Sequence, residues 1–138
     1  MGDSAEVTLL EGHVYINHLP CRVKKCKMCL LRADSHKRVT LEQVKAILGG
    51  REIDFLFIDG DHTYEGVKRD FEMYSLLVRK RGIIAFGDIV PGGWESVGGV
   101  SQFWNEVTSY YHIKEREIVQ DRSQEGFGIG LLYVTRSR

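Results

Sequence analysis

The sequence has little proline, few cysteines, no excess of charge and no long apolar run. Its 138 residues include 2 Pro and 3 Cys, and 19 basic residues balance 19 acidic ones. The balanced charge gives no support to a chain-wide role on nucleic acid or on a membrane surface. No apolar run approaches the ~18 residues that cross a bilayer, and the acidic start MGDSAEVTLLEGH lacks the order of a signal peptide. We therefore expect a cytoplasmic protein.

The three cysteines, Cys21, Cys26 and Cys29, are spaced C-x4-C-x2-C. An odd number without a secretion signal argues against a disulfide framework. A zinc site needs a fourth ligand, which His18 or His36 could supply. However, Cys29 opens the run CLLRAD, where a small buried residue is expected. A zinc or redox protein built around the cysteines is therefore only a third hypothesis.

Apolar residues recur along the chain in the periods of alternating strands and helices. The runs IDFLFID and GIIAFGD are apolar on both faces, which is typical of interior parallel strands. We predict strands at 5–10, 13–17, 28–33, 53–59, 82–88, 112–119 and 126–134, and helices at 40–48, 63–78 and 99–111. The last two strands are separated by the polar stretch QDRSQE, which indicates an antiparallel hairpin.

These elements predict one α/β domain over residues 1–138, with a mostly parallel sheet that ends in an antiparallel hairpin. Thr40 is the expected cap of the first helix, and Gly49 its expected end.

Acidic residues follow three of the predicted core strands. They are Asp34 after the first, Asp59 and Asp61 after the second, and Asp88 after the third. Ligands of open α/β sheets sit beyond the carboxyl ends of the strands, although short polar residues there are also ordinary helix caps. Carboxylates that lie side by side repel and favour a cation such as Mg2+. His36, in the turn after Asp34, could face this ligand edge, but a place in a surface turn is favoured.

The stretch from LLRADSHKR to GIIAFGDIV, with IDGDHTYEG between, resembles the second half of class I S-adenosylmethionine-dependent methyltransferases. It is similar to the group that includes the rhamnosyl O-methyltransferase and cephalosporin hydroxylase type proteins. The resemblance covers roughly residues 30 to 135 and implies a Rossmann-like methyltransferase sheet. Residues 1–27 form a divergent N-terminal segment, so the N-terminal half of that sheet is expected to be incomplete.

The resemblance also implies roles for single residues. S-adenosylmethionine would be bound by Asp34 and Ser35, next to the adenine, and by Asp61 and His62 in the cofactor-side turn. Asp59 and Asp88 would be the catalytic residues and the ligands of a divalent ion, Mg2+ among the candidates. The reaction would be metal-assisted methyl transfer to the oxygen of a small hydroxylated acceptor.

Two departures from the family pattern bear on this expectation. Gly87 stands where relatives carry a side chain before the final acid, and the Gly-rich cofactor loop is missing, because only 33 residues precede Asp34. The chain therefore resembles a methyltransferase truncated at its N-terminus. The pieces VTLL and HVYI are candidates to fill the middle of the sheet, or a second copy or a partner chain completes it.

Whether the chain is an enzyme stays open between two hypotheses. One is a methyltransferase that binds S-adenosylmethionine. The other is a non-catalytic module of the same fold, used for binding or oligomerisation.

Overall fold

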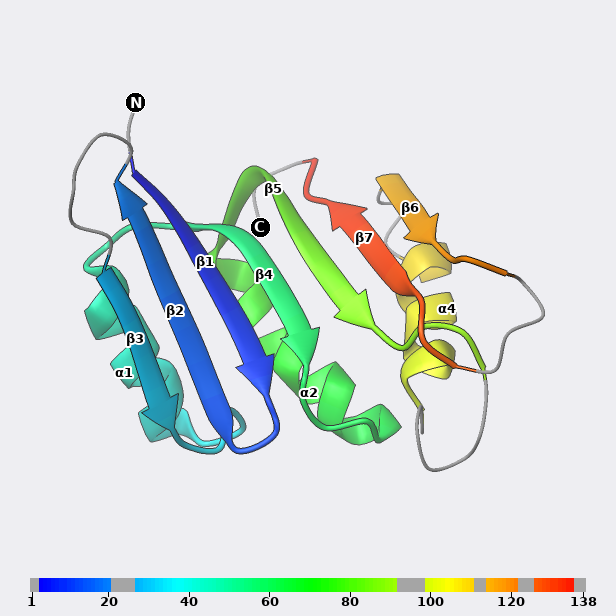
Figure 1. Ribbon diagram of the computed structural model, residues 1–138, viewed down its shortest axis with the longest axis horizontal. Coiled ribbons are helices and arrows are strands. Elements are labelled where there is room, and N and C mark those ends of the chain that lie inside the picture. Colours follow the sequence, from blue (N-terminus) through cyan, green and yellow to red (C-terminus); the bar gives the residue numbers. More distant parts are fainter. Residues whose placement is uncertain (1–2, 21–26, 92–98, 111–113, 122–125, 136–138) are drawn as a thin grey trace.

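In the computed structural model, residues 3–20, 27–91, 99–110, 114–121 and 126–135 are described. They form one seven-stranded sheet with three α-helices (Figure 1). The strands are β1 (Asp3–Leu10), β2 (His13–Pro20), β3 (Lys27–Arg32), β4 (Ile53–Asp59), β5 (Val78–Gly87), β6 (Lys114–Ile118) and β7 (Ile129–Tyr133). The helices are α1 (Arg38–Leu48), α2 (Tyr64–Tyr74) and α4 (Val100–Tyr110), and a short 3-10 turn, η1 (Ser75–Leu77), follows α2. None of the described helices is long and apolar enough to cross a membrane.

The strand order is β3-β2-β1-β4-β5-β7-β6. It confirms the predicted α/β class, the closing hairpin, and the idea that the two N-terminal strands fill the middle of the sheet. The expectation of a mostly parallel sheet is wrong at the level of pairing. Only β1–β4 and β4–β5 pair in parallel, whereas the other four pairs of described strands are antiparallel.

The reversed strand β2 explains this difference. Glu11 and Gly12 alone connect β1 to β2, and Gly12 has a φ of 78°. A two-residue connection permits only an antiparallel hairpin, because a parallel pair needs a crossover of a dozen residues or more. The chain thus fills both positions between β3 and β4 without a helix between the two strands.

The helix boundaries follow local capping. α1 begins at Arg38 with Lys37 as its N-cap, so the predicted Thr40 cap is wrong; Thr40 lies inside the helix and is buried. Gly49 ends α1 as predicted, with a φ of 61° that a glycine adopts without strain. After α2, the 3-10 turn lets β5 begin at Val78, four residues before the predicted strand.

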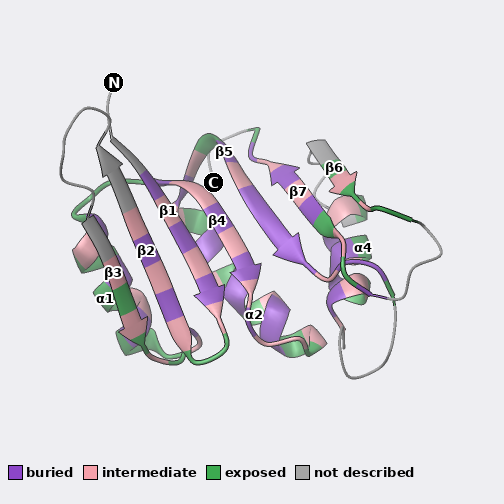
Figure 2. Cartoon of the chain, viewed as in Figure 1, coloured by how far each residue is buried: buried purple, intermediate pink, exposed green. Residues whose placement is uncertain are grey.

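One face of the sheet carries all three helices, which lie behind the strands in Figure 1. Buried residues alternate with half-buried ones along β1, β2 and β4, and the buried set faces the helices (Figure 2). In the core, the Phe86 ring lies 6.0 Å from that of Phe71 on α2 and 5.7 Å from that of Trp104 on α4. Burial of these rings ties both helices to the same strand.

The opposite side, which we call the open face, carries no helix among the described residues. Its middle row runs across all seven strands in register: Leu30, Tyr15, Thr8, Phe57, Ala85, Leu131 and Arg116.

Candidate functional site

The carboxyl ends of β4 and β5 lie next to each other because the two strands pair in parallel, with Ile58 opposite Phe86. Asp59 is the last residue of β4, and Asp88 follows the last residue of β5. Asp88 has a φ of 62°, and its backbone N–H donates to the Gly128 carbonyl at 2.9 Å. Asp tolerates this left-handed backbone better than most residues. The topology therefore brings the two predicted metal ligands to one point of the sheet edge.

His62 joins the two carboxylates. Its Nε2 lies 3.4 Å from Asp88 Oδ2 and 4.0 Å from Asp59 Oδ1. One ligand atom from each of the three residues can be chosen so that all lie within 4.8 Å of one another. The resemblance had assigned His62 to the cofactor, but the structure places it with Asp59 and Asp88.

Gly87 makes room for this cluster. A Cβ added at Gly87 would lie 2.6 Å from Asp59 Oδ1, which is closer than Cβ contacts in proteins allow. The Asp59 carboxylate thus lies over Gly87, the position at which the sequence analysis found a ligand to be missing. Any side chain at position 87 would have to displace that carboxylate.

The pKa of Asp59 is raised, first by burial and then by the negative charge of Asp88, while His62 acts in the opposite direction. A positive charge held between the two carboxylates would offset both of the raising effects. Two carboxylates and one imidazole suit a divalent first-row ion such as Mn2+, and the carboxylates alone suit Mg2+. The three residues therefore fit the implied ion.

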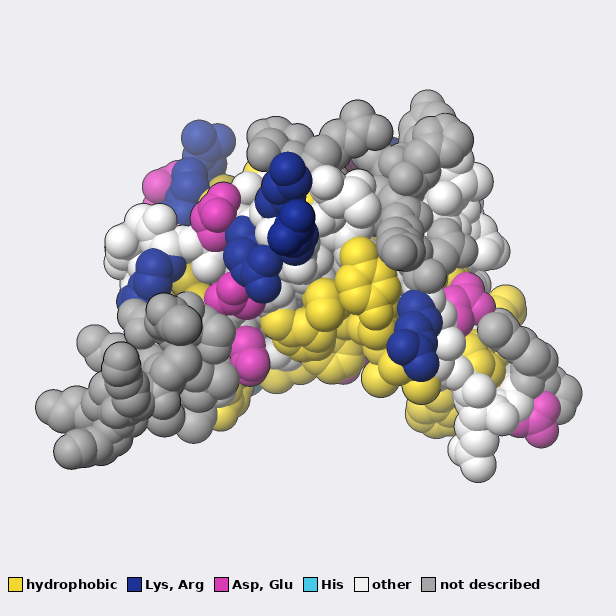
Figure 3. All heavy atoms as spheres, turned by 90° about the horizontal axis from the view of Figure 1, so that it is seen from above, with side chains coloured by type: hydrophobic (Ala, Val, Ile, Leu, Met, Phe, Trp, Pro, Cys, Tyr) yellow, Lys and Arg dark blue, Asp and Glu magenta, His cyan; other side chains and the backbone are white. Residues whose placement is uncertain are grey.

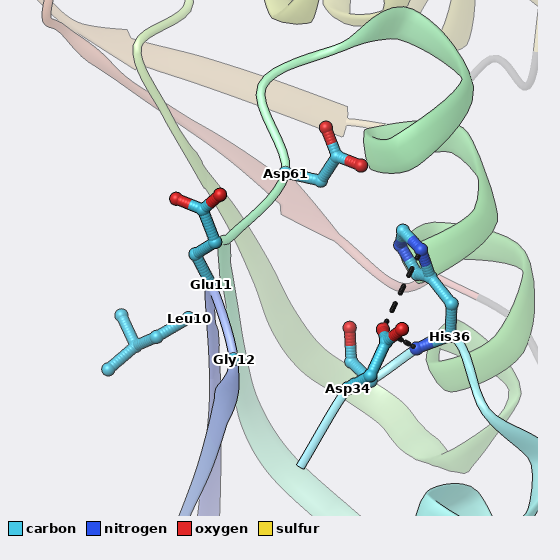
Figure 4. Close-up of a pocket in the computed structure, with 7 residues that line it drawn as sticks. Leu10, Glu11, Gly12, Asp34, His36 and Asp61 are labelled. Atoms are coloured by element: carbon cyan, nitrogen blue, oxygen red, sulfur yellow. Dashed lines mark hydrogen bonds and ion pairs between the residues drawn. The ribbon is translucent and has the colours of Figure 1, made fainter. Parts of the chain in front are cut away.

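A cavity of about 320 Å³ lies beside this cluster, at the carboxyl ends of β1 and β3 (Figure 4). This volume is at the lower end of the range for small-molecule sites. Its lining residues are Leu10, Glu11, Gly12, Asp34, Ser35, His36 and Asp61. The structure thus brings together three of the four predicted cofactor residues, Asp34, Ser35 and Asp61, and adds an acid from the hairpin turn.

Asp61 has a structural role as well as a place in the cavity wall. Its Oδ1 accepts hydrogen bonds from the Thr63 backbone N–H at 2.9 Å and from the Thr63 hydroxyl at 2.8 Å. Burial alone would raise the pKa of Asp61, but these two hydrogen bonds, together with the nearby His36 and His62, outweigh it and the pKa is lowered. Asp61 therefore contributes a negative charge to the cavity at neutral pH.

Asp70 lies behind the cavity wall and was not anticipated. Its carboxylate is fully buried, accepts a hydrogen bond from the Ser35 hydroxyl at 2.6 Å, and lies 3.2 Å from Nε2 of His36. Its second oxygen, Oδ2, is buried without a hydrogen-bond partner. His36, which the sequence assigned to a surface turn, lines the cavity and connects it to Asp70.

The cysteine hypothesis finds no support in the described residues. Cys29 is a half-buried free thiol that packs against the core from β3. His36 is engaged by Asp70. Cys21 and Cys26 and the side chain of His18 lie outside the described residues.

Two sequence comparisons found similar proteins. Residues 22–89 match the model of a family described as a methyltransferase domain. A stretch of 42 residues is 50% identical to an uncharacterised protein of Acanthamoeba polyphaga mimivirus, and covers 30% of this chain and 19% of that protein.

Two solved structures share the fold. An O-methyltransferase from Bacillus cereus, in complex with SAH, is 20% identical, with a TM-score of 0.50 over 70% of this chain and 46% of that one. The O-methyltransferase TomG from Streptomyces achromogenes, in complex with SAM, is 18% identical, with a TM-score of 0.53 over 72% of this chain and 48% of that one. This chain thus spans about half the length of the enzymes whose fold it shares.

The described residues thus share the Rossmann-like fold of these two O-methyltransferases. The segment that matches the methyltransferase-domain model, residues 22–89, contains β3, β4 and β5 together with Asp34, Asp59, Asp61 and Asp88.

Proposed function

We propose that the chain binds S-adenosylmethionine in the acidic cavity and supports methyl transfer to the oxygen of a small hydroxylated acceptor. The observation that carries the proposal is the cluster of Asp59, His62 and Asp88 directly beside that cavity. Asp61, in the cavity wall, immediately precedes His62, so one turn borders both places.

On the cofactor side, the support comes from the residues that line the cavity. Carboxylates such as those of Asp34 and Asp61 accept hydrogen bonds from ribose hydroxyls and from the adenine amino group. They also attract the positive charge of a sulfonium. The two similar O-methyltransferases were solved with SAM or SAH, which is consistent with a nucleoside in this place.

On the acceptor side, we propose that Asp59, His62 and Asp88 hold a divalent ion. Such an ion, when bound, lowers the pKa of an acceptor hydroxyl and orients it. Asp59 lies 34% exposed and Asp88 18% exposed, so both carboxylates remain accessible from the solvent side. Because His62 contributes an imidazole, we expect Mn2+ to bind at least as well as Mg2+.

Calorimetric titration with SAM and SAH, with and without Mg2+ or Mn2+, tests the proposal. We expect Asp34→Asn to weaken the binding of SAH, because it removes a carboxylate from the cavity. We expect Asp59→Asn to weaken the binding of Mn2+, which electron paramagnetic resonance measures. The same variant should leave SAH binding nearly unchanged. Glu42→Gln, an exposed change on α1, is the control and should alter neither.

The absence of any SAM or SAH binding at millimolar ligand would contradict the proposal. It would favour the second candidate, a non-catalytic module of the methyltransferase fold. The observation behind that candidate is the two-residue turn between β1 and β2, which leaves no room for a Gly-rich crossover loop.

A further inference from the structure

Among the described residues that line the acidic cavity, His36 is the one whose side chain can carry a positive charge. The other titratable side chains of the lining are those of Glu11, Asp34 and Asp61. Lys and Arg side chains are visible instead from the opposite edge of the sheet, where the parallel strands begin (Figure 3). The His36 side chain is 22% exposed and lies on the same side of the cavity as Asp34, across from Glu11 (Figure 4). Its protonation therefore decides which hydrogen bonds this wall of the cavity can offer.

Two neighbouring groups fix the proton of the neutral His36 ring on Nε2. This atom lies 3.1 Å from the Gly66 carbonyl oxygen, and a carbonyl oxygen only accepts hydrogen bonds. It also lies 3.2 Å from Asp70 Oδ1, which accepts a hydrogen bond from the Ser35 hydroxyl. Nε2 is therefore a donor in both protonation states, and Nδ1 is the atom that gains or loses a proton.

Helix α2 holds the turn that carries His36. The Tyr74 hydroxyl donates to the Ser35 carbonyl at 2.9 Å. Arg69 Nη2 donates to the His36 carbonyl at 3.2 Å, and the His36 backbone N–H donates to Asp34 Oδ1 at 2.9 Å. With the turn held in this way, His36 Nδ1 lies 3.9 Å from Asp34 Oδ1. The imidazole and the carboxylate thus present two adjacent hydrogen-bonding groups to a ligand.

The protonation state of Nδ1 sets what this pair of groups can bind. When His36 is neutral, Nδ1 and the Asp34 carboxylate are both acceptors, whereas protonation makes Nδ1 a donor beside an acceptor. Adenine carries the complementary pair, because a ring nitrogen that accepts stands next to an amino group that donates. The protonated pair therefore matches an edge of adenine, and the neutral pair does not.

We propose that His36 and Asp34 together bind the aminopurine base of the ligand in the acidic cavity, with His36 protonated and held in place by Asp70. The Asp34 carboxylate accepts from the amino group, and Nδ1–H donates to the neighbouring ring nitrogen. Asp70 does not line the cavity, so it is a positioning residue. The inference rests on the proposed binding of S-adenosylmethionine, and adds to it the residue that selects the base and a dependence of binding on pH.

The surroundings of His36 are mostly acidic. Burial acts to raise the pKa of Asp61 and of Asp70, and the positive charge of His36 acts to lower both. Arg69 contacts the backbone carbonyl of His36 and not the ring. Burial raises the pKa of Tyr74, so its hydroxyl stays neutral. The charged groups that face His36 are those of Asp34, Asp61, Asp70, Arg69 and, across the cavity, Glu11.

Calorimetric titration with SAH from pH 6.5 to 8.5, without divalent ions, tests the proposal. This range lies above the pKa of Asp70, about 6, so a change within it reports the imidazole. We expect the affinity to fall by up to about tenfold per pH unit where the imidazole loses its proton. His36→Gln should bind SAH more weakly at pH 6.5 and lose this pH dependence. His13→Gln, at a half-buried histidine that does not line the cavity, is the matched control and should keep the wild-type profile.

Two further measurements test the base contact and the proton position separately. S-inosylhomocysteine carries a carbonyl in place of the amino group, and should bind the wild type at least about tenfold more weakly than SAH. Nitrogen-15 NMR of the unliganded chain should show the Nε2–H form of neutral His36, assigned by its absence in His36→Gln.

Three outcomes would overturn the inference while SAH binding itself persists. They are an Nδ1–H form of neutral His36, an equal pH dependence in the wild type and in His36→Gln, and equal affinity for the two nucleosides. A lack of SAH binding at every pH would instead overturn the proposed function and this inference with it.

Discussion

Asp70 is a carboxylate for which the fold provides two polar neighbours and no solvent. Burial raises its pKa to about 6; the Ser35 hydrogen bond and the nearby His36 act against this, whereas Asp61 and Asp34 act with it. The folded chain therefore binds a proton at Asp70 more readily than the unfolded chain does. Between the unfolded pKa of about 3.8 and the folded value of about 6, stability should fall as the pH rises.

We predict that Asp70→Asn removes this part of the pH dependence. The shift corresponds to a loss on the order of 3 kcal/mol for the wild type between pH 4 and pH 7, and the neutral amide should not show it. Urea unfolding at a series of pH values measures the difference. Glu42→Gln, at an exposed acid of α1 that does not act on Asp70, should keep the wild-type slope; an unchanged slope in Asp70→Asn would refute the assignment.

The helical spacing of α2 contains a signal for the burial of Asp70. Val67, Phe71 and Tyr74 define the buried face of α2, and position 70 falls on that same face at helical spacing. An acid on an apolar helical stripe indicates a buried carboxylate and a partner elsewhere. The hydrogen-bond partner of Asp70 could not be predicted from the sequence, because Ser35 is 35 residues away along the chain.

At the scale of the element, the start of α2 connects the site to the helix. The Thr63 hydroxyl accepts a hydrogen bond from the Gly66 N–H at 3.0 Å and donates one to Asp61. The space over Gly66 is filled by the Asp61 side chain, since a Cβ there would lie 2.1 Å from Asp61 Cγ. The helix start, the cap and the cavity wall thus depend on the same few atoms.

We predict that Thr63→Ala costs about 1 kcal/mol of unfolding free energy, the usual effect of losing a cap. The pKa of Asp61 should rise at the same time, because one of the two hydrogen bonds that lower it is lost. Chemical denaturation and carboxyl-detected NMR titration measure the two effects. Thr63→Ser keeps the hydroxyl and should restore both; a rise in pKa with the serine as large as that with the alanine would contradict the explanation.

Helices and strands with a clear hydrophobic periodicity could be predicted from the sequence. The pairing of the strands in the sheet could be predicted only in part. IDFLFID and the closing hairpin were placed within a few residues. The reversed direction of β2 was missed, although the two-residue turn at Glu11-Gly12 already excludes a parallel crossover. The Thr40 cap failed because Lys37, without a side-chain cap bond, begins the helix one turn earlier.

The candidate site was predictable as a set of strand ends, since parallel strands bring their carboxyl ends to one edge. The separation of its residues into an Asp59–His62–Asp88 cluster and a cavity wall was not predictable from the sequence. His62 lies with Asp59 and Asp88, whereas Asp61 turns toward Thr63 and the cavity. Neighbours in sequence separate here because the turn after β4 changes direction within a few residues, and spacing alone does not give that direction.

At the scale of the whole molecule, removal of a phenylalanine ring should change the free energy of unfolding by different amounts on the two faces of the sheet. Phe86 on β5 is fully buried under α2 and α4, and Phe57 on the neighbouring strand β4 lies half-buried on the open face. Phe86→Ala should cost about 3–5 kcal/mol of unfolding free energy at any protein concentration, because it empties space inside one copy.

Phe57→Ala should cost less unfolding free energy than Phe86→Ala, because Phe57 is half-buried and its removal leaves a space that opens to solvent rather than a closed cavity. Urea unfolding of the wild type and of both variants measures the two losses. A loss in Phe57→Ala as large as that in Phe86→Ala would contradict this difference between the two faces.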